Sequence, residues 1–403
     1  MLPFCLFAQT DNPDENPLKF TPKELNIGSS AIFDLMGVSP SQITRPSDVR
    51  DFKVDWSFKS WRLNPNIAIQ AQPVWEALYN GRNMSKFVEA PGFLKRLSTL
   101  EVSLGTVQSE NQDRRIGFAT KLNLYRQKDP LLVKDFFSDR LEEYKVELDS
   151  NKEQLTALKQ QLKETKDAAE YLSVSNQIIA AENERSQILT RQRDELTTLS
   201  ESFMAQYWNG SFLDIGYGNV NTYFTDSVGT LKSLRLNRNT GSALWLTGGV
   251  GLGRKWLITG MLRTLQYDEQ IFFTLQDTVT FEAANRDTII GNNLLTFGVN
   301  IRYGSPYFNL FAEYFSDQRR VSDRVDVLTR NGYGSQQGDL PPDVVLVNES
   351  VAWNLQPVHS LTLGGDWRFS RNVILNFGLR VEYDSKWKRQ TFTPIAAIAC
   401  LMR

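Results

Sequence analysis

The chain has 403 residues, of which 45 are Lys or Arg and 46 are Asp or Glu, so its formal net charge is −1. This balance lacks the basic excess typical of nucleic-acid-binding proteins, and we expect no nucleic-acid partner. One His and two Cys are too few for a His/Cys zinc site, for a Ser-His-Asp triad with a spare histidine or for a disulfide framework, so the composition predicts no metal and no cofactor.

The chain starts with a short apolar stretch. Residues 1–9 read MLPFCLFAQ, and an Asp- and Pro-rich segment follows. We expect residues 1–9 to be the remainder of a secretory signal peptide that starts further upstream; a disordered apolar N-terminus is the alternative. Residues 10–50 include Pro40 and Pro46, which favour extended or turn backbone. We therefore expect residues 10–50 to form an extended segment that acts as a plug.

Two regions, residues 51–126 and 206–403, alternate apolar and polar side chains. The pattern is clearest at 294–303 (LLTFGVNIRY) and 373–383 (VILNFGLRVEY), where every second residue is apolar. A period of two is that of a β-strand. Similar patterns predict ten further strands at 51–61, 67–75, 98–108, 114–126, 206–218, 241–252, 255–268, 306–317, 355–369 and 390–402.

The length of these strands and the aromatic residues near their ends indicate a membrane barrel. The strands are about 10–15 residues long, against about 5–6 in most soluble sheets. Strands cross a bilayer only in a closed barrel, because an open edge leaves backbone groups unpaired. We predict a twelve-stranded antiparallel barrel, surrounded by lipid, in the outer membrane of a Gram-negative bacterium; a long-stranded soluble barrel or solenoid is the alternative. The residues expected in interfacial belts are Tyr303, Tyr314, Trp367, Phe369, Tyr383 and Trp387.

Turn lengths orient the predicted strands. Short connections occur at 253–254, 304–305 and 370–372, and long ones at 219–240, 269–292 and 318–354. Outer-membrane barrels have short periplasmic turns and long outer loops. Counting back from the C-terminus, which is then periplasmic, makes 51–61 the first of twelve strands. A plug inside the lumen is the alternative for that segment.

Residues 127–205, between the two strand regions, have a different composition. No Gly or Pro occurs at 131–209, and Glu, Gln, Lys, Leu and Ala dominate, which predicts helix. Apolar residues follow heptad spacing from Leu141 to Leu172, as in a coiled coil. One straight helix would span on the order of 100 Å, yet its ends join strands about 5 Å apart. We therefore expect a periplasmic coiled-coil hairpin that bends at 172–176 (LSVSN).

The reach of this hairpin exceeds what the stability of a barrel requires. We expect it to be an arm that binds a periplasmic or outer-membrane protein partner. The expected partner-binding residues are Leu158, Leu162, Tyr171 and Leu172. The alternative is that the two helices only bury each other's apolar faces.

Placing the polar strand faces inward gathers charged residues in the lumen. The expected lumen-lining residues are Glu101, Arg115, Lys121, Asp214, Arg263, Arg302, Glu313, Asp366, Arg368, Arg380 and Glu382. This mixture of six basic and five acidic side chains favours ion pairs that fill the interior over a selective pore. Tyr307, Phe311 and Phe315 are also expected inside. We predict a plugged or narrow interior, with 40–60 and 318–354 as candidate plugs.

The sequence predicts no catalytic residues and no enzymatic activity. His359 is the only His, and Ser360 beside it points to the opposite face of the predicted strand, so the two cannot act as base and nucleophile. We interpret His359 as a residue of an interfacial belt or rim. The run 248–253 (GGVGLG) resembles a phosphate-binding loop, but it lies in a predicted strand and no Lys-Ser/Thr follows it.

Residues 28–46 (GSSAIFDLMGVSPSQITRP) join a small-residue and apolar stretch to Gly-Val-Ser-Pro and Arg-Pro, and an alternating strand follows. This arrangement resembles the start of a group of Bacteroidota outer-membrane β-barrel proteins that carry an N-terminal GVSP…RP segment. The matching positions are Leu35, Gly37, Val38, Ser39, Pro40, Ile43, Arg45 and Pro46. The resemblance implies an outer-membrane location and brings no catalytic residues and no substrate.

Together these patterns predict a non-enzymatic accessory or scaffold subunit of an envelope complex for secretion, assembly or transport. Such a subunit would dock its partner through the helical hairpin. The alternative is a passive or gated channel for small or lipidic solutes. Conductance, or lipid bound in the lumen, would distinguish the channel from the scaffold.

Overall fold

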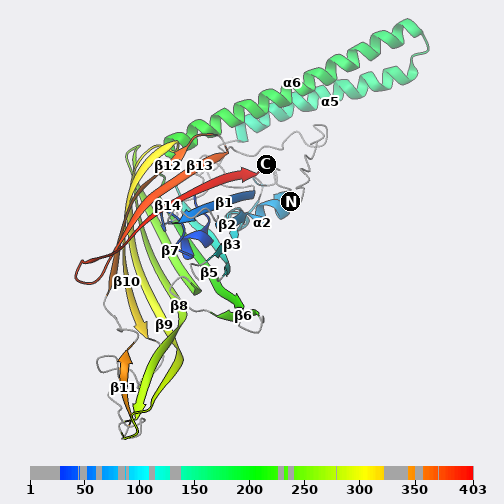
Figure 1. The fold of residues 1–403 in the computed structure, drawn as a ribbon. Helices are drawn as coiled ribbons and strands as arrows, with labels where there is room; N and C mark the ends of the chain where they lie inside the picture. Colours follow the sequence, from blue (N-terminus) through cyan, green and yellow to red (C-terminus); the bar gives the residue numbers. More distant parts are fainter. Residues whose placement is uncertain are drawn as a thin grey trace. The chain divides into compact units, whose positions relative to one another are not determined.

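The structure of the chain is a computed structural model (Figure 1). It describes residues 28–43, 45, 52–59, 66–79, 87, 90–108, 114–127, 138–225, 231–234, 240–277, 279–321, 344–349, 357–370 and 372–402. The chain divides into two compact units. One holds the barrel strands and the segment that precedes them, and the other holds the two long helices; each unit is described by itself.

Twelve of the described strands form a closed antiparallel barrel. They are β1 (Phe52–Lys59), β2 (Asn66–Ala71), β3 (Glu101–Gln108), β4 (Arg114–Arg126), β5 (Phe212–Thr225), β7 (Gly241–Leu252), β8 (Trp256–Asp277), β9 (Ala283–Gly304), β10 (Phe308–Val321), β12 (Val358–Arg368), β13 (Val373–Tyr383) and β14 (Arg389–Met402). Each pairs with its neighbours in this order, and β14 pairs with β1 to close the barrel. The predicted twelve-stranded barrel is thus confirmed, including 51–61 as its first strand.

Several strands differ from their predicted bounds, most clearly in three places. The strand expected at 67–75 ends at Ala71, because Pro73 lacks an N–H and starts helix α2 (Pro73–Tyr79). The strand expected from 206 begins only at Phe212, because a helix continues to Tyr207. The expected loop 269–292 is mostly a two-stranded ribbon, since β8 and β9 stay paired out to Gln276 and Ala283.

Two shorter strands lengthen the ribbon end of the barrel. The strand β6 (Leu231–Leu234) pairs with β5, and β11 (Val344–Glu349) pairs with β8. Beyond the end of β10, the structure describes only β11 within the candidate plug 318–354. This strand pairs with the edge of β8. Residues 322–343 and 350–354 of that candidate lie outside the described residues.

Between the described strands of the barrel, the three shortest turns are at one end. They join β7 to β8, β9 to β10 and β12 to β13. The last strand also finishes there, because the N–H of Leu401 donates to Asn372 O at 2.9 Å. The helical insertion begins and ends at the same end, where the N–H of Gln127 donates to Ser211 O at 2.7 Å.

The insertion contains two antiparallel helices, α5 (Ser138–Glu164) and α6 (Ala168–Tyr207). The predicted hairpin is therefore present, but the predicted bend at 172–176 is wrong, because the chain turns at 165–167. Ala169 and Leu172, which the heptad pattern placed in the seam, are consequently exposed. Val174 and Ile178 pack there instead, against Leu155 and Leu158. None of the helices in the described part of the chain has the length and apolar content needed to cross a membrane.

Candidate functional site

The interior of the barrel is occupied by a segment that precedes the first strand. We call residues 28–43 together with Arg45 the plug segment; all of it except Ser29 and Gln42 is buried. It was expected to be extended, but residues 31–35 form the helix α1 (Ala31–Leu35). This short helix packs against β3, β4 and β5. Gly37, with φ of 70°, ends the helical turn by adopting a conformation that side chains disfavour.

Wall glycines make room for the apolar side chains of the plug segment. A Cβ on Gly105 would lie 2.9 Å from Ile32 Cγ2, and one on Gly218 would lie 2.7 Å from Leu35 Cδ2. A Cβ on Gly378 would likewise lie 3.2 Å from Pro40 Cβ. The absence of these side chains lets the segment approach the wall backbone closely, so wall and plug segment are complementary in shape.

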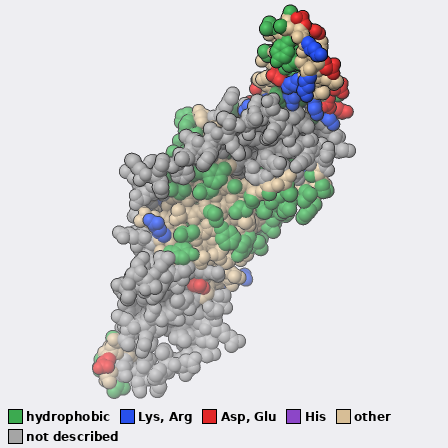
Figure 2. All heavy atoms as spheres, turned by 90° about the vertical axis from the view of Figure 1, so that its right-hand side faces the viewer, with side chains coloured by type: hydrophobic (Ala, Val, Ile, Leu, Met, Phe, Trp, Pro, Cys, Tyr) green, Lys and Arg blue, Asp and Glu red, His purple; other side chains and the backbone are tan. Residues whose placement is uncertain are grey.

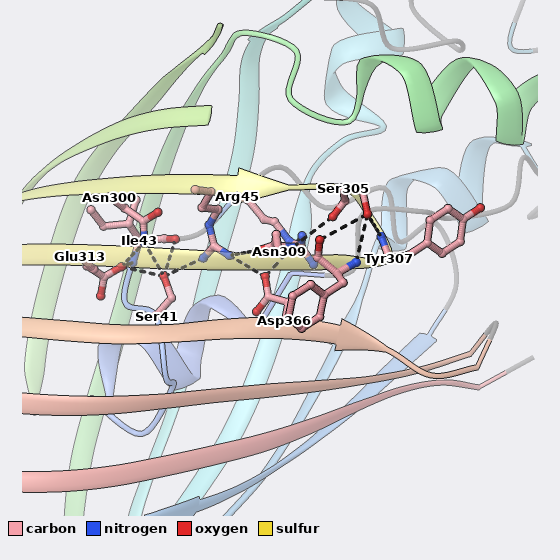
Figure 3. A network of polar contacts seen from close by, with 11 residues as sticks. Ser41, Ile43, Arg45, Asn300, Ser305, Tyr307, Asn309, Glu313 and Asp366 are labelled. Atoms are coloured by element: carbon pink, nitrogen blue, oxygen red, sulfur yellow. Dashed lines mark hydrogen bonds and ion pairs between the residues drawn. The ribbon is translucent and has the colours of Figure 1, made fainter. Parts of the chain in front are cut away.

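Glu313 on β10 is a hydrogen-bond acceptor for three consecutive plug residues, of which Ser41 and Ile43 are shown in Figure 3. Ser41 Oγ donates to its Oε2 at 2.7 Å, the N–H of Gln42 to its Oε1 at 2.8 Å, and the N–H of Ile43 to its Oε2 at 3.2 Å. Asn300 Nδ2, on β9, donates to Oε2 at 2.8 Å. A buried carboxylate needs several such donors to offset its lost hydration.

A buried ion-pair cluster lies next to this carboxylate. Arg302 Nη1 on β9 lies 2.5 Å from Asp366 Oδ2 on β12, and Arg45 Nη1 of the plug segment lies 3.5 Å from the same oxygen. Arg302 Nη2 also donates to Ser41 Oγ at 3.0 Å, and its guanidinium lies 4.6 Å from the ring centroid of Phe311. Two wall residues and two plug residues are therefore joined in one network.

Arg380 on β13 binds the backbone of the plug segment. Its Nη1 donates to Gly37 O at 3.2 Å, and its Nη2 donates to Ser39 O at 2.9 Å and to Pro40 O at 3.4 Å. These carbonyls have no helix or sheet partner, so the buried guanidinium supplies the hydrogen bonds that water would otherwise make.

The start of the plug segment is held by the first strand. Asp55 Oδ2 on β1 accepts hydrogen bonds from Ser30 N at 2.7 Å and from Ser30 Oγ at 2.5 Å, and it lies 3.1 Å from Lys53 Nζ. Lys53 Nζ also donates to Gly28 O. Sequence reasoning missed this pair, although Lys53, Asp55 and Ser57 are the polar side of the alternating pattern that identified the strand.

The predicted lumen-lining residues point inward. Glu101, Lys121, Asp214, Arg263, Arg302, Glu313, Asp366 and Arg380 are buried, whereas Arg115, Arg368 and Glu382 are half-buried on the same strand faces. Phe311 and Phe315 are also buried. Tyr307 was expected inside, but this was wrong, because it lies in the turn between β9 and β10 and half of its surface is exposed. Lys121 Nζ lies 3.0 Å from Glu101 Oε2 and 4.0 Å from Asp214 Oδ2, so this part of the interior is also filled by paired charges.

Of the four residues expected to bind a partner, two lie in the seam between the helices and two are exposed. Leu158 is buried between α5 and α6, and Leu162 packs against the same cluster. Tyr171 and Leu172 follow the bend and are 51% and 65% exposed. Only the last two are open to a partner in this packing of the helices.

Polar residues also contribute to the contact between the two helices. Asn151 Nδ2 on α5 donates to Ala181 O on α6 at 3.1 Å within the seam. Lys159 Nζ lies 3.0 Å from Glu182 Oε1 on the outer side. A buried polar residue in such a seam favours one register, because other registers would leave it unpaired.

His359 is in an aromatic stack on the outer face of the barrel. Its ring lies parallel to that of Trp387, with centroids 4.6 Å apart, and its Nδ1 is 2.8 Å from Tyr314 Oη. Ser360 is buried on the opposite face, so no base–nucleophile pair forms between them. Within the described residues, no group of three or more His, Cys, Asp or Glu side chains could hold a metal ion. The glycine-rich run 248–253 forms the end of β7 and the following turn.

The outward side chains of the barrel are apolar. Figure 2 shows hydrophobic side chains spread over the barrel wall and charged side chains gathered on the helical hairpin. Exposed residues such as Leu244, Leu262 and Leu363 alternate along their strands with buried residues. The outward aromatic residues Trp256 and Tyr303 pair at the short-turn end, with ring centroids 4.7 Å apart.

This distribution matches a bilayer. His359 and Trp367 lie eight positions apart on β12, or about 26 Å along the strand and about 20 Å along the barrel axis at a typical tilt, close to the apolar band of about 25 Å in membrane barrels. A closed barrel with polar groups inside and an apolar band outside, bounded by aromatic residues, is the architecture of outer-membrane proteins. The chain is an outer-membrane β-barrel of a Gram-negative bacterium.

Several solved structures are similar to the chain at low sequence identity and low TM-score. The translocator domain of the autotransporter NalP from Neisseria meningitidis is 11% identical, covering 88% of this chain and 89% of its own, with a TM-score of 0.33. The NanC porin is 6% identical, covering 87% and 99%, with a TM-score of 0.31. The transport unit of the autotransporter AIDA-I from Escherichia coli is 8% identical, covering 87% and 89%, with a TM-score of 0.30. No protein-family model and no curated protein matches the chain. Similarities this low carry no argument about what the chain does.

Proposed function

We propose that the chain is a non-enzymatic scaffold subunit of an envelope complex. In this proposal the barrel anchors the protein in the outer membrane, and the hairpin of α5 and α6 binds a protein partner. The observation that carries it is the plug segment, because Glu313, Arg302 and Arg380 bind it through buried hydrogen bonds and all of its residues except Ser29 and Gln42 are buried. A barrel filled in this way is poorly suited to passive conduction, whereas the two long helices of the hairpin offer a large surface for a protein partner.

The position of the insertion in the chain supports a periplasmic partner. It follows β4 and precedes β5 at the end of the barrel where the short turns lie, and short turns are periplasmic in this class. The exposed pair Tyr171 and Leu172 is the part of this surface best suited to an apolar partner site. Tyrosine is enriched among the residues that anchor protein interfaces, and the exposed Leu172 adds apolar surface beside it.

The direct test replaces residues 138–206 with a short linker. The hydrogen bond between Gln127 and Ser211 holds the two ends together, so the shortened chain is expected to form the same barrel, visible as heat-modifiable mobility on gels. Affinity purification in mild detergent should then lose a partner that the full chain retains. An unchanged set of co-purifying proteins would contradict the proposal. A finer variant, Tyr171→Ser with Leu172→Ser, should weaken the same capture, whereas Leu199→Ser elsewhere on α6 should not.

A gated channel for small or lipidic solutes is the second candidate. The observation in its favour is that the plug segment is attached to the wall by non-covalent contacts in the described residues, so it could leave as a unit. Planar-bilayer recording of the intact protein distinguishes the two functions. The scaffold proposal expects little steady conductance, and a large steady conductance would favour the channel.

A further inference from the structure

The turn between β13 and β14 concentrates positive charge at the rim of the apolar wall. Lys386, Lys388 and Arg389 are all exposed, and they form no salt bridge with an acidic side chain of the described residues. Asp384 is the acidic residue of this turn, and its carboxylate serves the backbone. Its Oδ1 accepts the N–H groups of Lys386 and Lys388 at 2.9 and 2.8 Å, and its Oδ2 accepts from Gln390 Nε2 at 3.1 Å.

These backbone hydrogen bonds, the bond from Lys388 first, hold the pKa of Asp384 below its ordinary value. The carboxylate therefore remains ionised and committed to the turn. Lys388 also interacts electrostatically with this carboxylate. The three exposed cationic side chains form no ion pair with another described residue, so they can contact an external anion. They are at the end of the barrel opposite the short turns, because β13 finishes and β14 begins there.

The same turn places an aromatic side chain on the outer wall. Trp387 has a φ of 59°, which a non-glycine residue adopts at a cost, and its indole stacks on His359 with an interplanar angle of 2°. Tyr383 lies next to it, with ring centroids 5.8 Å apart. Aromatic rings at this level belong to the membrane interface, where lipid headgroups meet acyl chains.

An apolar groove of about 580 Å³ lies on the same strands, deeper in the wall. Its lining includes Leu310, Leu363, Phe377, Leu379, Pro394 and Ala396. Gly364 and Gly378 are also part of the lining and face each other across β12 and β13, so the wall is thin there. Leu379 lies four positions before Tyr383, and Pro394 five positions after Arg389, so the groove begins about 13–17 Å along the strands from the cationic turn.

We infer that this face binds one anionic, phosphate-bearing membrane lipid. Its phosphate contacts Lys386, Lys388 and Arg389, its upper acyl region lies against Trp387, and one chain enters the groove between Leu379 and Pro394. The occupant follows from the site's chemistry: cations at the headgroup level and an apolar cavity at the acyl level, on a surface that faces the bilayer.

The test measures lipid binding to the full chain by native mass spectrometry in detergent, with phosphatidylglycerol as the anionic probe and phosphatidylcholine as the zwitterionic one. The wild type should bind phosphatidylglycerol preferentially. The triple variant Lys386→Gln, Lys388→Gln, Arg389→Gln should lose about tenfold or more in affinity for the anionic lipid. The matched control removes three exposed cations from the hairpin, by Lys152→Gln, Lys163→Gln and Lys166→Gln, and should bind as the wild type does.

Two further variants separate charge from cavity. Lys386→Arg with Lys388→Arg keeps the charge and should retain binding, which also guards against a turn that fails to fold. Ala396→Phe fills the groove and should weaken binding of both lipids several-fold, whereas Thr106→Phe on the outer face of β3 should not. Equal binding by the glutamine variant and the wild type would overturn the inference. Displacement of the lipid by millimolar inorganic phosphate alone would overturn the choice of a lipid as the ligand.

Discussion

Ser41 donates a 2.7 Å hydrogen bond to Glu313 inside the barrel, although the two residues are 272 positions apart in the chain. This bond joins the segment before the first strand to β10, which lies much later in the sequence. Glu313 also accepts two backbone N–H groups of the same segment. The plug segment is therefore held by specific acceptors and donors on the wall, and its removal would leave buried charges unpaired.

Glu313→Gln should loosen the plug segment. The amide carries no charge, and its NH₂ group would face donors that now bind a carboxylate, at a cost of about 1–3 kcal/mol for each buried group left unpaired. We expect a lower melting temperature and a larger single-channel conductance in planar bilayers. Glu382→Gln is the control, because Glu382 is half-buried and accepts from Thr391 rather than from the plug segment. Equal effects of the two substitutions would contradict the role assigned to Glu313.

Arg380→Gln should expose the middle of the plug segment. The shorter side chain cannot reach the carbonyls of Gly37, Ser39 and Pro40, so these groups would turn toward water. In a background with both cysteines replaced by alanine, Ser39→Cys reports this change. Its maleimide labelling should become about tenfold faster or more, because hydrogen bonds to a charged group contribute about 1.5–3 kcal/mol.

The control for that experiment is Arg368→Gln in the same background. Arg368 lies on β12 and donates to Ser370 O beside a short turn. Labelling of the cysteine at position 39 should keep its slow rate in this control. A fast rate already present with Arg380 intact would show that the segment is not held as described.

Gly105→Ala should clash with the plug segment, and Ile32→Ala should relieve the clash. The new methyl group would lie 2.9 Å from Ile32 Cγ2, and overpacking of this kind costs about 1–3 kcal/mol. The double variant should be more stable than the sum of the single effects predicts, with a coupling of about 0.5–3 kcal/mol. Thermal unfolding of the four proteins measures this cycle. Gly92→Ala, where a Cβ meets nothing within 4 Å, should be harmless, and additivity in the cycle would argue against the contact.

Leu196→Ala should destabilise the hairpin, whereas Leu172→Ala should not. Leu196 is 1% exposed, and removing a buried leucine side chain costs about 2–5 kcal/mol. Leu172 is 65% exposed because the chain bends before it, so its loss should change stability by less than about 0.5 kcal/mol. The helical ellipticity of the full chain, followed on heating, reports the difference. A bend at 172–176 would reverse the expectation for Leu172.

The stability of the hairpin should fall at high pH because of Tyr144. Burial, followed by the nearby Glu195, raises the pKa of this phenol from 10.0 to about 12. The folded helices thus favour the neutral form, so the stabilisation is complete below about pH 10 and is lost as the pH rises through about 12. Thermal midpoints of the helical signal across this range should show the loss. Tyr144→Phe should flatten the profile, and an identical pH dependence in that variant would exclude Tyr144 as its source.

The alternating pattern was enough to identify the barrel strands. At 373–383 the predicted strand has the bounds of β13, and at 114–126 it has those of β4. A period of two is imposed by the strand backbone itself and by the lipid on one side, so it is visible residue by residue. The same signal placed Lys121, Arg302 and Arg380 on the inner face, where the structure has them.

Sequence patterns whose outcome depends on contact with another helix or strand of the chain were harder to interpret. The heptad pattern of the sequence placed Ala169 and Leu172 in the seam between the helices. Alanine and leucine match this pattern whether or not a second helix packs against them. The bend at 165–167 contains no Gly or Pro to mark it. Likewise, the ribbon formed by β8 and β9 beyond the predicted loop start is stabilised by the pairing of two strands, which neither strand shows alone.

The sequence alone determined the barrel, the inserted helices, and which face of each strand is polar and which is apolar. These features follow from the period and composition of neighbouring residues. The sequence also predicted a plug within residues 10–50. Only the tertiary structure decided that residues 28–43 and Arg45 are buried in the interior, and that Glu313, Asp366 and Arg380 bind this plug segment. Those contacts join residues hundreds of positions apart, and they arise only after the strands close in one register. Closure fixes which inward side chains meet, and no local pattern contains that information.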